Sequence, residues 1–357
     1  MVSLRFLADI HRAARGRRDA KGVLRQWFEM AALFAVRGNG PGYYQMAGLW
    51  RRGRSWAEIS GHWSMARYES ELARLNPPGY RKISQHKIAE KAVLTLMRIP
   101  TPRYIGVLDT ACGRDAEGNV LRDADDLTRL FEREGARRVC FKLVEGWSGK
   151  GFAAVEVIRG AGAPRFRPLN DQRELTAAEL LAHLDYAPGR PRLLEEYLDQ
   201  HPALASFNPS SVNTLRLWVL RRGDTAETRL GYLRIGRQGS MVDNHGAGGI
   251  VAPVDLATAR LIAAHDGLME RRVFPVHPDH GAPIAGIELP HFRAAMELAE
   301  QCLVAFPNMN FAGVDVAMAV DGPRVIELNA RPDREAAGYV GMTTRDVFLS
   351  GPPPQPS

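Results

Sequence analysis

Residues 311–332 place acidic and amide side chains inside two apolar segments, and this combination constrains the fold more than any other feature. The two segments are joined at Asp321-Gly322, a dipeptide typical of a β-hairpin turn. Asp315 lies in the first segment, and Glu327 and Asn329 lie in the second. Carboxylates are costly to bury alone and repel one another when they are close. The simplest neutraliser is a hard cation such as Mg²⁺, which takes carboxylate and amide oxygens as ligands.

The register of this hairpin decides whether the three side chains can meet. A two-residue Asp-Gly turn would point Asp315 and Glu327 to opposite faces of the sheet. A three-residue loop over 321–323 would place Asp315 opposite Asn329 and diagonal to Glu327, with all three on one face. Pro323 cannot donate a ladder hydrogen bond, which favours a position in the loop. We therefore expect the three-residue loop; the alternative is an ordinary hairpin with exposed acids at its ends.

Composition limits the class of protein. The chain has 357 residues, enough for two or three subdomains, and its 45% hydrophobic and 24% charged content is that of a soluble globular protein. The net charge of +7 suits a polyanionic ligand such as a nucleotide, an acidic substrate or a membrane surface. Three widely spaced cysteines, with no zinc or disulfide pattern, and the lack of a signal-peptide pattern predict a cytoplasmic protein.

Residues 1–80 are predicted to form a basic helical extension. Helical apolar spacing over 24–36 ends at the glycine-rich stretch 38–42, and basic residues are dense over 12–25 and 50–56. One interpretation is a peripheral contact with anionic lipid or another acidic polymer. The plainer interpretation, which we favour, is a solvated helix face that caps the main domain. Because no nucleic-acid-binding motif accompanies the basic residues, no nucleic-acid partner is expected.

A glycine-rich loop follows a strand that carries a lysine. Residues 138–144 and 154–158 read as strands, and Gly146-Trp-Ser-Gly-Lys-Gly151 lies between them. The loop is neither a Walker A motif nor a dinucleotide fingerprint, because a strand and not a helix comes next. Its glycines can still offer backbone N–H groups to phosphates. Lys142, inside the apolar strand, is unfavourable there unless its ammonium group reaches an anion.

Further elements complete an α+β pattern. We expect helices over 84–97, 123–134 and 292–306 and strands over 104–108 and 231–236. Residues 208–220 are expected to be a polar loop that enters a buried strand, with Arg216 embedded in the strand. A second glycine-rich loop, residues 242–251, carries Asn244 and His245. The terminal residues 346–357, rich in proline, are expected to be a disordered tail.

The order of these parts resembles the ATP-grasp fold, in which two α+β lobes clamp ATP. The resemblance spans about residues 80–340. Residues 40–44, 208–216, 243–249 and 277–284 make it closest to the sugar-transfer-associated ATP-grasp proteins. After the basic helical extension over 1–80, it implies a small lobe with the lysine-bearing helix over 81–200 and a large lobe with the metal site over 201–345. One departure is the ending Glu327-Leu-Asn-Ala-Arg331, which is more similar to general ATP-grasp ligases than to that family.

The resemblance also implies roles for individual residues. ATP would be bound by two lysines, by the glycine-rich loop and by a hinge, namely Lys87, Lys142, Gly146, Ser148, Gly149, Gly151, Glu195, Glu196, Leu198 and Asp199. Asp315, Glu327 and Asn329 would hold Mg²⁺. Arg216 and Arg331 would neutralise charge on the transferred phosphoryl group. Asn213, Asn244 and His245 would line the acceptor pocket, although His245 could equally be an ordinary hydrogen-bonded loop residue.

Three functions are compatible with the resemblance. The first is a ligase that joins a small-molecule carboxylate to an amine through an acyl phosphate, in polysaccharide or natural-product biosynthesis. The second is a phosphotransferase that acts on a hydroxyl group or a histidine. The third is a non-catalytic nucleotide-binding partner of a polysaccharide machine, against which the lysines and acids argue. The absence of a Ser-His-Asp or Cys-His pattern agrees with the first, which needs no covalent enzyme nucleophile.

Overall fold

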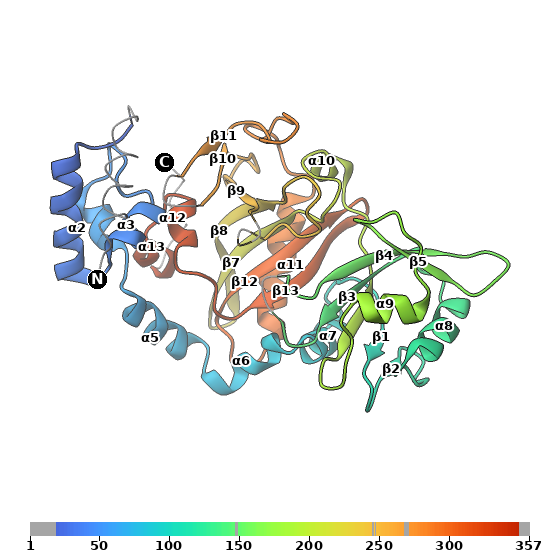
Figure 1. Ribbon diagram of the computed structural model, residues 1–357. Coiled ribbons are helices and arrows are strands. Elements are labelled where there is room, and N and C mark those ends of the chain that lie inside the picture. Colours follow the sequence, from blue (N-terminus) through green and yellow to red (C-terminus); the bar gives the residue numbers. More distant parts are fainter. Residues whose placement is uncertain (1–18, 147–148, 245, 247, 268–270, 350–357) are drawn as a thin grey trace.

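The computed structural model describes residues 19–146, 149–244, 246, 248–267 and 271–349, and it contains two antiparallel sheets with helices packed around them (Figure 1). The predicted α+β class is confirmed. One sheet is built from residues 104–196 and the other from residues 214–329, so the chain passes from the first to the second near residue 200. In the described ranges, no helix combines the length and apolar character that crossing a membrane requires.

The small lobe is a six-stranded sheet in the order β2-β1-β6-β3-β4-β5. Its core is formed by apolar residues of the strands and of two helices, among them Phe131, Phe141 and Phe166, which are fully buried. The elements are β1 Tyr104–Leu108, β2 Arg114–Asp115, α8 Ala124–Arg133, β3 Arg138–Leu143, β4 Ala153–Ile158, β5 Arg165–Pro168, α9 Ala177–His183 and β6 Arg192–Glu196. The predicted strand–glycine loop–strand arrangement is confirmed by β3 and β4.

The large lobe is a seven-stranded sheet in the order β11-β10-β9-β8-β7-β12-β13. One face is apolar and packs on helix α11, Phe292–Ala305, through side chains such as Leu217, Val314 and Val316. The opposite face carries the alternate residues, including Arg216 and Asp315. The elements, with the short helix that precedes them, are α10 Pro202–Ala205, β7 Thr214–Arg222, β8 Thr225–Ile235, β9 Ile250–Pro253, β10 Ala264–His265, β11 Val273–Phe274, β12 Phe311–Ala319 and β13 Gly322–Asn329.

The hairpin of β12 and β13 forms as predicted, but its register differs from the expected one. Ala319 pairs with Gly322, so the loop has two residues and Pro323 lies inside β13. A bulge then shifts the register, and Asp315 lies directly opposite Glu327, not Asn329. Proline is tolerated because β13 is the outer strand of the sheet. The bulge adds one residue to β13, which returns Asp315 and Glu327 to the same face.

The predicted helix over 84–97 is confirmed by α7 (Lys87–Leu96), which begins later than expected because a separate helix, α6 (Pro78–Gln85), ends just before it. They meet at His86, whose side chain caps α7. Leu94 of α7 is buried in the core of the large lobe together with residues of α11. Helix α7 was expected to belong to the small lobe, but its apolar side packs on the large one, so it lies between the two sheets.

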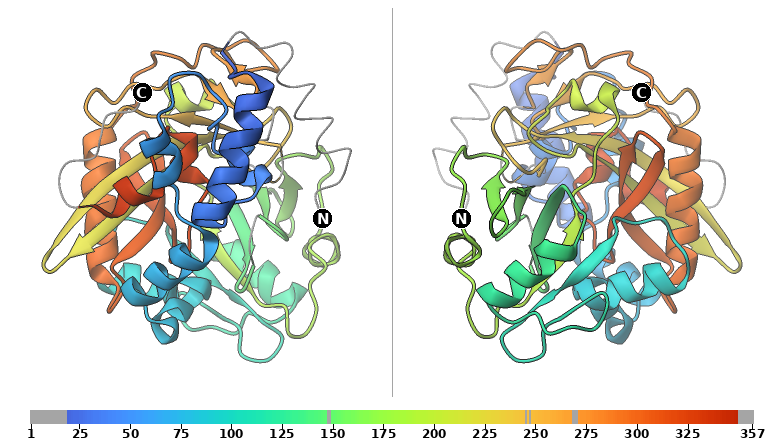
Figure 2. Two further views of the ribbon diagram at one scale, coloured as in Figure 1. Left: turned by 90° about the vertical axis from the view of Figure 1, so that its left-hand side faces the viewer. Right: turned by 90° about the vertical axis from the view of Figure 1, so that its right-hand side faces the viewer.

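The N-terminal extension has a small core of its own and docks on the C-terminal helices α12 and α13. Arg334 donates hydrogen bonds to Asn39 Oδ1 and to the Trp63 carbonyl, both at 2.8 Å. The Trp63 N–H donates to Thr344 Oγ1 at 2.6 Å. The extension therefore caps the large lobe, and its outermost helix faces the viewer in the left view of Figure 2. The helices are α2 Val23–Arg37, α3 Pro41–Met46, α4 Trp56–Gly61, α5 Met65–Leu75, α12 Ala336–Tyr339 and α13 Thr344–Phe348.

The predicted start of the disordered tail is wrong. Residues 346–348 belong to α13, and Val347 is fully buried. Its side chain packs in a cluster with Phe311 and Trp218, which explains why this segment is ordered despite the prolines that follow. The remaining tail, residues 350–357, lies outside the described residues.

Candidate active site

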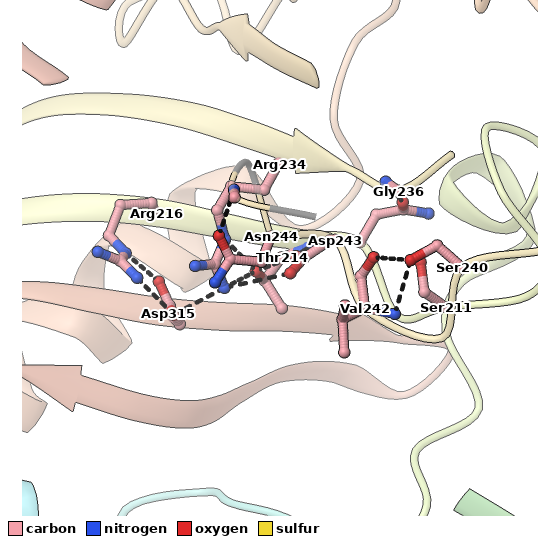
Figure 3. Close-up of polar contacts among 12 residues, drawn as sticks. Ser211, Thr214, Arg216, Arg234, Gly236, Ser240, Val242, Asp243, Asn244 and Asp315 are labelled. Carbon is pink, nitrogen blue, oxygen red and sulfur yellow. Dashed lines mark hydrogen bonds and ion pairs between the residues drawn. The ribbon is translucent and has the colours of Figure 1, made fainter. Parts of the chain in front are cut away.

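The polar face of the large sheet brings two arginines to one buried carboxylate. Asp315 lies opposite Arg216 on the neighbouring strand β7, and the two form a bidentate ion pair. Arg234 of β8 also reaches Asp315, with Nη2 at 2.8 Å from Oδ2 (Figure 3). Asp315 is 2% exposed, so this group is almost entirely removed from water.

Electrostatics favours the charged form of every member of this group. Burial would raise the pKa of Asp315, but Arg216 and Arg234 outweigh burial and lower it. Burial would likewise lower the pKa of Arg216, and the Asp315 carboxylate outweighs it and raises that pKa overall. The two guanidinium groups carry more positive charge than Asp315 alone can neutralise, and a second carboxylate, Asp243, lies 3.4 Å from Arg234.

A second buried carboxylate extends the network. Asp243 accepts hydrogen bonds from the backbone N–H (2.8 Å) and the hydroxyl of Thr214, and it lies 3.4 Å from Arg234. Neither Arg234 nor Asp243 was selected from the sequence. Arg234 carries the same signal that marked Arg216, a lone charge inside an apolar strand, and could have been found by it.

In the small lobe, a buried glutamate holds two lysines. Lys142 Nζ lies 2.5 Å from Glu195 Oε2, and Lys91 pairs with the other oxygen of the same carboxylate. Burial opposes charge on Glu195, but Lys142 and Lys91 prevail and lower its pKa. Burial would lower the pKa of Lys142, and Glu195 reverses this and raises it. The anion that the sequence required for Lys142 is, in this structure, the side chain of Glu195.

Helix α7 connects this lysine group to the acidic hairpin. The buried carboxylate of Glu90 accepts a hydrogen bond from the Leu328 N–H of β13. Burial, and next the neighbouring Glu327 carboxylate, raise the pKa of Glu90 well above its ordinary value. Glu327 also raises the pKa of Lys142, so the lysines of one lobe and the acids of the other share one electrostatic environment. Lys91 and Glu90 were missed by the sequence analysis, because helical spacing alone does not separate them from surface charges.

The glycine-rich loop spans from this lysine group to the large lobe. Lys87, the first residue of α7, donates from Nζ to the Gly146 carbonyl at 3.0 Å. Gly149 has a φ of +70°, and a β-carbon added there would lie 2.9 Å from Val242 Cγ1, next to Asp243. Both the conformation and the contact thus require glycine at 149. Ser148 and His245, two further predicted site residues, lie outside the described residues.

The predicted hinge lies at the end of β6. Glu196 pairs with Arg103 at 2.9 Å, and Asp199 pairs with Arg138, whose guanidinium group lies over the Tyr197 ring. Leu198 is half-buried. The Glu196 and Asp199 side chains thus already have cationic partners, and the Glu196 and Tyr197 N–H groups donate to the Arg103 and Arg138 carbonyls, both at 2.9 Å.

The three remaining predicted site residues, Asn213, Asn244 and Arg331, differ in burial and in their hydrogen-bond partners. Asn213 is fully buried, and its side-chain amide bonds to the Leu204 carbonyl and to the Gly236 N–H, which favours a structural role. Asn244 is half-buried and its Oδ1 accepts from the Gly246 N–H at 2.9 Å. Arg331 is exposed and binds Glu69 of α5, so the structure does not bring it together with Arg216.

The hairpin offers oxygen donors of the kind that Mg²⁺ prefers. Asp315 and Glu327 are a directly opposed pair, and Asn329 follows two residues later on the same face. Asp315 is shared with the two arginines, whereas Glu327 is half-buried and raises the pKa of Glu90, so added positive charge there would be stabilising. Counting only His, Cys, Asp and Glu, the described residues contain no group of three or more arranged for a metal. A set of three oxygen donors suited to Mg²⁺ is therefore reached only when the Asn329 amide is counted with Asp315 and Glu327.

Two surface cavities lie away from these residues. One is lined by Ala226 and by α11 residues such as Glu297 and Val304, and the other lies between α5 and the end of β7. The space between the lobes is instead crossed by the contacts of α7 and of the glycine-rich loop described above.

Comparison with known proteins identifies a family over most of the chain. A family described as sugar-transfer associated ATP-grasp matches residues 66–345. No curated protein sequence matches the chain. Similar solved structures include N5-carboxyaminoimidazole synthase from Aspergillus clavatus in complex with ADP (12% identity, 76% of this chain, 52% of that chain, TM-score 0.41) and D-alanyl-alanine synthetase A from Vibrio cholerae (11%, 76%, 60%, 0.41). A third is the L-amino acid ligase from Bacillus licheniformis (11%, 72%, 43%, 0.39). The match thus spans about half of each of those proteins, and similarity at this level carries no argument about the reaction.

Proposed function

The chain belongs to the sugar-transfer associated ATP-grasp family, and from this premise we propose that it is an ATP-dependent ligase that joins a carboxylate to an amine. The observation that carries the proposal is that α7 contacts both lobes. Its Lys91 shares Glu195 with Lys142, and its Glu90 accepts a hydrogen bond from the Leu328 N–H of β13, the strand that carries Glu327 opposite Asp315. The lysines suit the phosphates of ATP, and the acids suit a divalent cation bound to them.

The reaction has two steps. A carboxylate oxygen of the first substrate attacks the γ-phosphorus of ATP, the bond to the β-phosphate oxygen breaks, and ADP leaves. The amine nitrogen of the second substrate then attacks the acyl carbon, phosphate leaves with the bonding electrons, and the nitrogen loses a proton. Lys87 and Lys142 would bind the phosphates, and residues 146–151 would cover them. Arg216 and Arg234 would face the negative charge that develops on the acyl phosphate.

Asp315, Glu327 and Asn329 would hold Mg²⁺, which when bound would neutralise phosphate charge. The hinge backbone at Glu195 and Leu198 would contact the adenine, with Asp199 near the ribose. Asn244 and His245 would contribute to the acceptor pocket, while Asn213 would hold the end of β8 through the hydrogen bond that its Oδ1 accepts from the Gly236 N–H.

Released phosphate distinguishes the proposal from its alternatives. The protein would be incubated with Mg²⁺-ATP and with pools of amino acids and of acidic sugars. The ligase requires phosphate release that depends on both substrates, together with an amide product. A stable phosphorylated product would replace the ligase with a phosphotransferase. Absence of turnover with every pool, while nucleotide still binds, would support a non-catalytic nucleotide-binding protein.

Lys142→Ala is expected to raise the KM for ATP at least about tenfold, because a charge-assisted contact to phosphate is worth about 1.5–3 kcal/mol. Lys150→Ala is the matched control, since Lys150 lies in the glycine-rich loop but is exposed. Initial rates at varied ATP measure both variants. Equal effects would show that Lys142 serves Glu195 alone and does not bind nucleotide.

A further inference from the structure

Helix α2 exposes several large apolar side chains on its outer side. Leu24, Phe28 and Phe34 are 87%, 73% and 62% exposed, and they recur at the spacing that places them on one side of a helix. The exposed residues between them complete a continuous band, here named the α2 stripe: Leu24, Trp27, Phe28, Ala31, Phe34 and Ala35. An exposed apolar surface of this kind marks a place where a partner or a membrane binds.

The inner side of the same helix is partly polar, and its contacts fix the orientation. Glu29 is buried, and its Oε2 accepts from Lys21 Nζ at 2.7 Å and from the Tyr44 hydroxyl at 2.6 Å. Gln26 donates from Nε2 to the Lys21 carbonyl at 2.8 Å. Rotating α2 to bury the stripe would expose Met30 and Leu33 and break these bonds. The outward direction of the stripe is thus built into the packing of the extension.

Positive charge is concentrated in the same part of the chain. Residues 1–54 contain eleven Arg and Lys against three Asp and Glu, a net charge of +8, whereas the whole chain carries +7. The rest of the protein is therefore close to neutral. Among the described basic residues, Arg25 follows Leu24 on α2 and has a 64% exposed side chain. An apolar helix face with an exposed basic residue beside it has the chemistry of an interfacial membrane helix.

We propose that the α2 stripe binds the surface of an anionic membrane, with its apolar residues in the headgroup region and the exposed Arg25 side chain of the same helix reaching the lipid phosphates. The helix forms the outer side of the molecule, at the end opposite the small lobe (Figures 1 and 2). A single convex helix suits a planar surface better than a groove-binding partner.

Charge also argues against the two other occupants. A second copy of the chain would bring another +8 extension against the first, and the two would repel. Residues 1–18 carry a net charge of +4, so laying them over α2 would add positive charge and neutralise none. An anionic bilayer neutralises both segments.

A fluorophore on α2 tests the proposal directly. Phe28→Cys is made in a Cys112→Ser background, because Cys112 is the exposed native cysteine while Cys140 and Cys302 are buried. The labelled full-length protein is mixed with phosphatidylcholine vesicles, either alone or containing phosphatidylserine. We expect a blue-shifted emission with the anionic vesicles only. The matched control is Leu96→Cys, on α7 and 82% exposed, whose emission is expected to stay unchanged.

Sedimentation with the same vesicles gives the magnitude. Replacing Leu24, Phe28 and Phe34 with Gln is expected to weaken binding to anionic vesicles at least about tenfold, whereas Leu96→Gln leaves it unchanged. Raising the salt from about 0.1 M to about 1 M should also release the protein, because the Debye length falls from about 10 Å to about 3 Å. Thermal unfolding of the variants checks that the extension stays folded.

Three results would overturn the proposal. One is equal or absent binding to both kinds of vesicle, and another is an unchanged affinity of the triple variant. The third is emission that is already blue-shifted before vesicles are added, which would mean that residues 1–18 or a second copy cover the stripe; light scattering separates these two. Binding is measured without nucleotide, so its outcome is independent of the proposed ligase reaction.

Discussion

Glu327→Gln is expected to lower ATP turnover by more than about 100-fold. Changing a residue that only supports a metal ligand costs up to about 100-fold, and Glu327 is proposed as a ligand itself. The side chain keeps its size and loses the charge that would hold Mg²⁺ beside Asp315. The change also removes the repulsion between the Glu90 and Glu327 carboxylates, which is one cause of the raised pKa of Glu90. The midpoint temperature of thermal unfolding should therefore change little. Phosphate release at saturating Mg²⁺-ATP, and thermal unfolding of the same sample, provide the two readouts.

Glu297→Gln serves as the control for this variant. Glu297 is exposed on α11, on the other face of the same sheet, and its change removes the same charge without touching the hairpin. Turnover of the control should equal that of the wild type. Near-normal turnover of Glu327→Gln would remove Glu327 from the proposed metal site, whatever the activity of the control.

Glu195→Gln is expected to lower the free energy of unfolding by about 3–5 kcal/mol, because it leaves two buried lysines without their shared anion. Lys91 and Glu195 are 7% and 1% exposed, so solvent cannot replace the lost charge. If the lysines bind phosphates as proposed, Mg²⁺-ATP should recover part of this loss. Denaturant unfolding with and without nucleotide measures both effects.

The next residue along the strand supplies a matched control. Glu196 has a 44% exposed side chain and pairs with the equally exposed Arg103, so Glu196→Gln should cost less than about 1 kcal/mol. Similar stability of the two variants would show that Glu195 is not required to neutralise the lysines. A large loss that nucleotide does not reduce would keep the structural role of Glu195 and argue against phosphate binding at Lys142.

Local patterns predicted most of the elements and half of the site. The strands on either side of the glycine-rich loop, helix α11 and the acidic hairpin all follow from apolar periodicity and turn residues, which act within a few residues of the chain. Lys142 and Arg216 were found because a charge inside an apolar strand requires a partner. The same rule, applied to residues 231–236, would have added Arg234.

What the sequence did not predict depends on contacts between distant segments. The register of the hairpin was wrong because Pro323 was judged as if β13 were an inner strand, and strand order is not encoded locally. Lys91 and Glu90 are important only because α7 packs between β6 and β13, which both follow it in the chain by more than 90 residues. No local sequence pattern predicts the bulge at Ile326 or these pairings.

The outer edge of β13 has a consequence for colloidal behaviour. The Val325 N–H donates to the Pro100 carbonyl at 2.8 Å, its carbonyl accepts from the Thr101 hydroxyl at 2.9 Å, and Pro323 has no N–H to offer. At the other end of the same sheet, β11 is only two residues long. Within the described residues, neither edge of this sheet presents a long row of unpaired backbone N–H and C=O groups with which a strand of another chain could pair. Fibrillar aggregation by strand addition is therefore disfavoured at both edges.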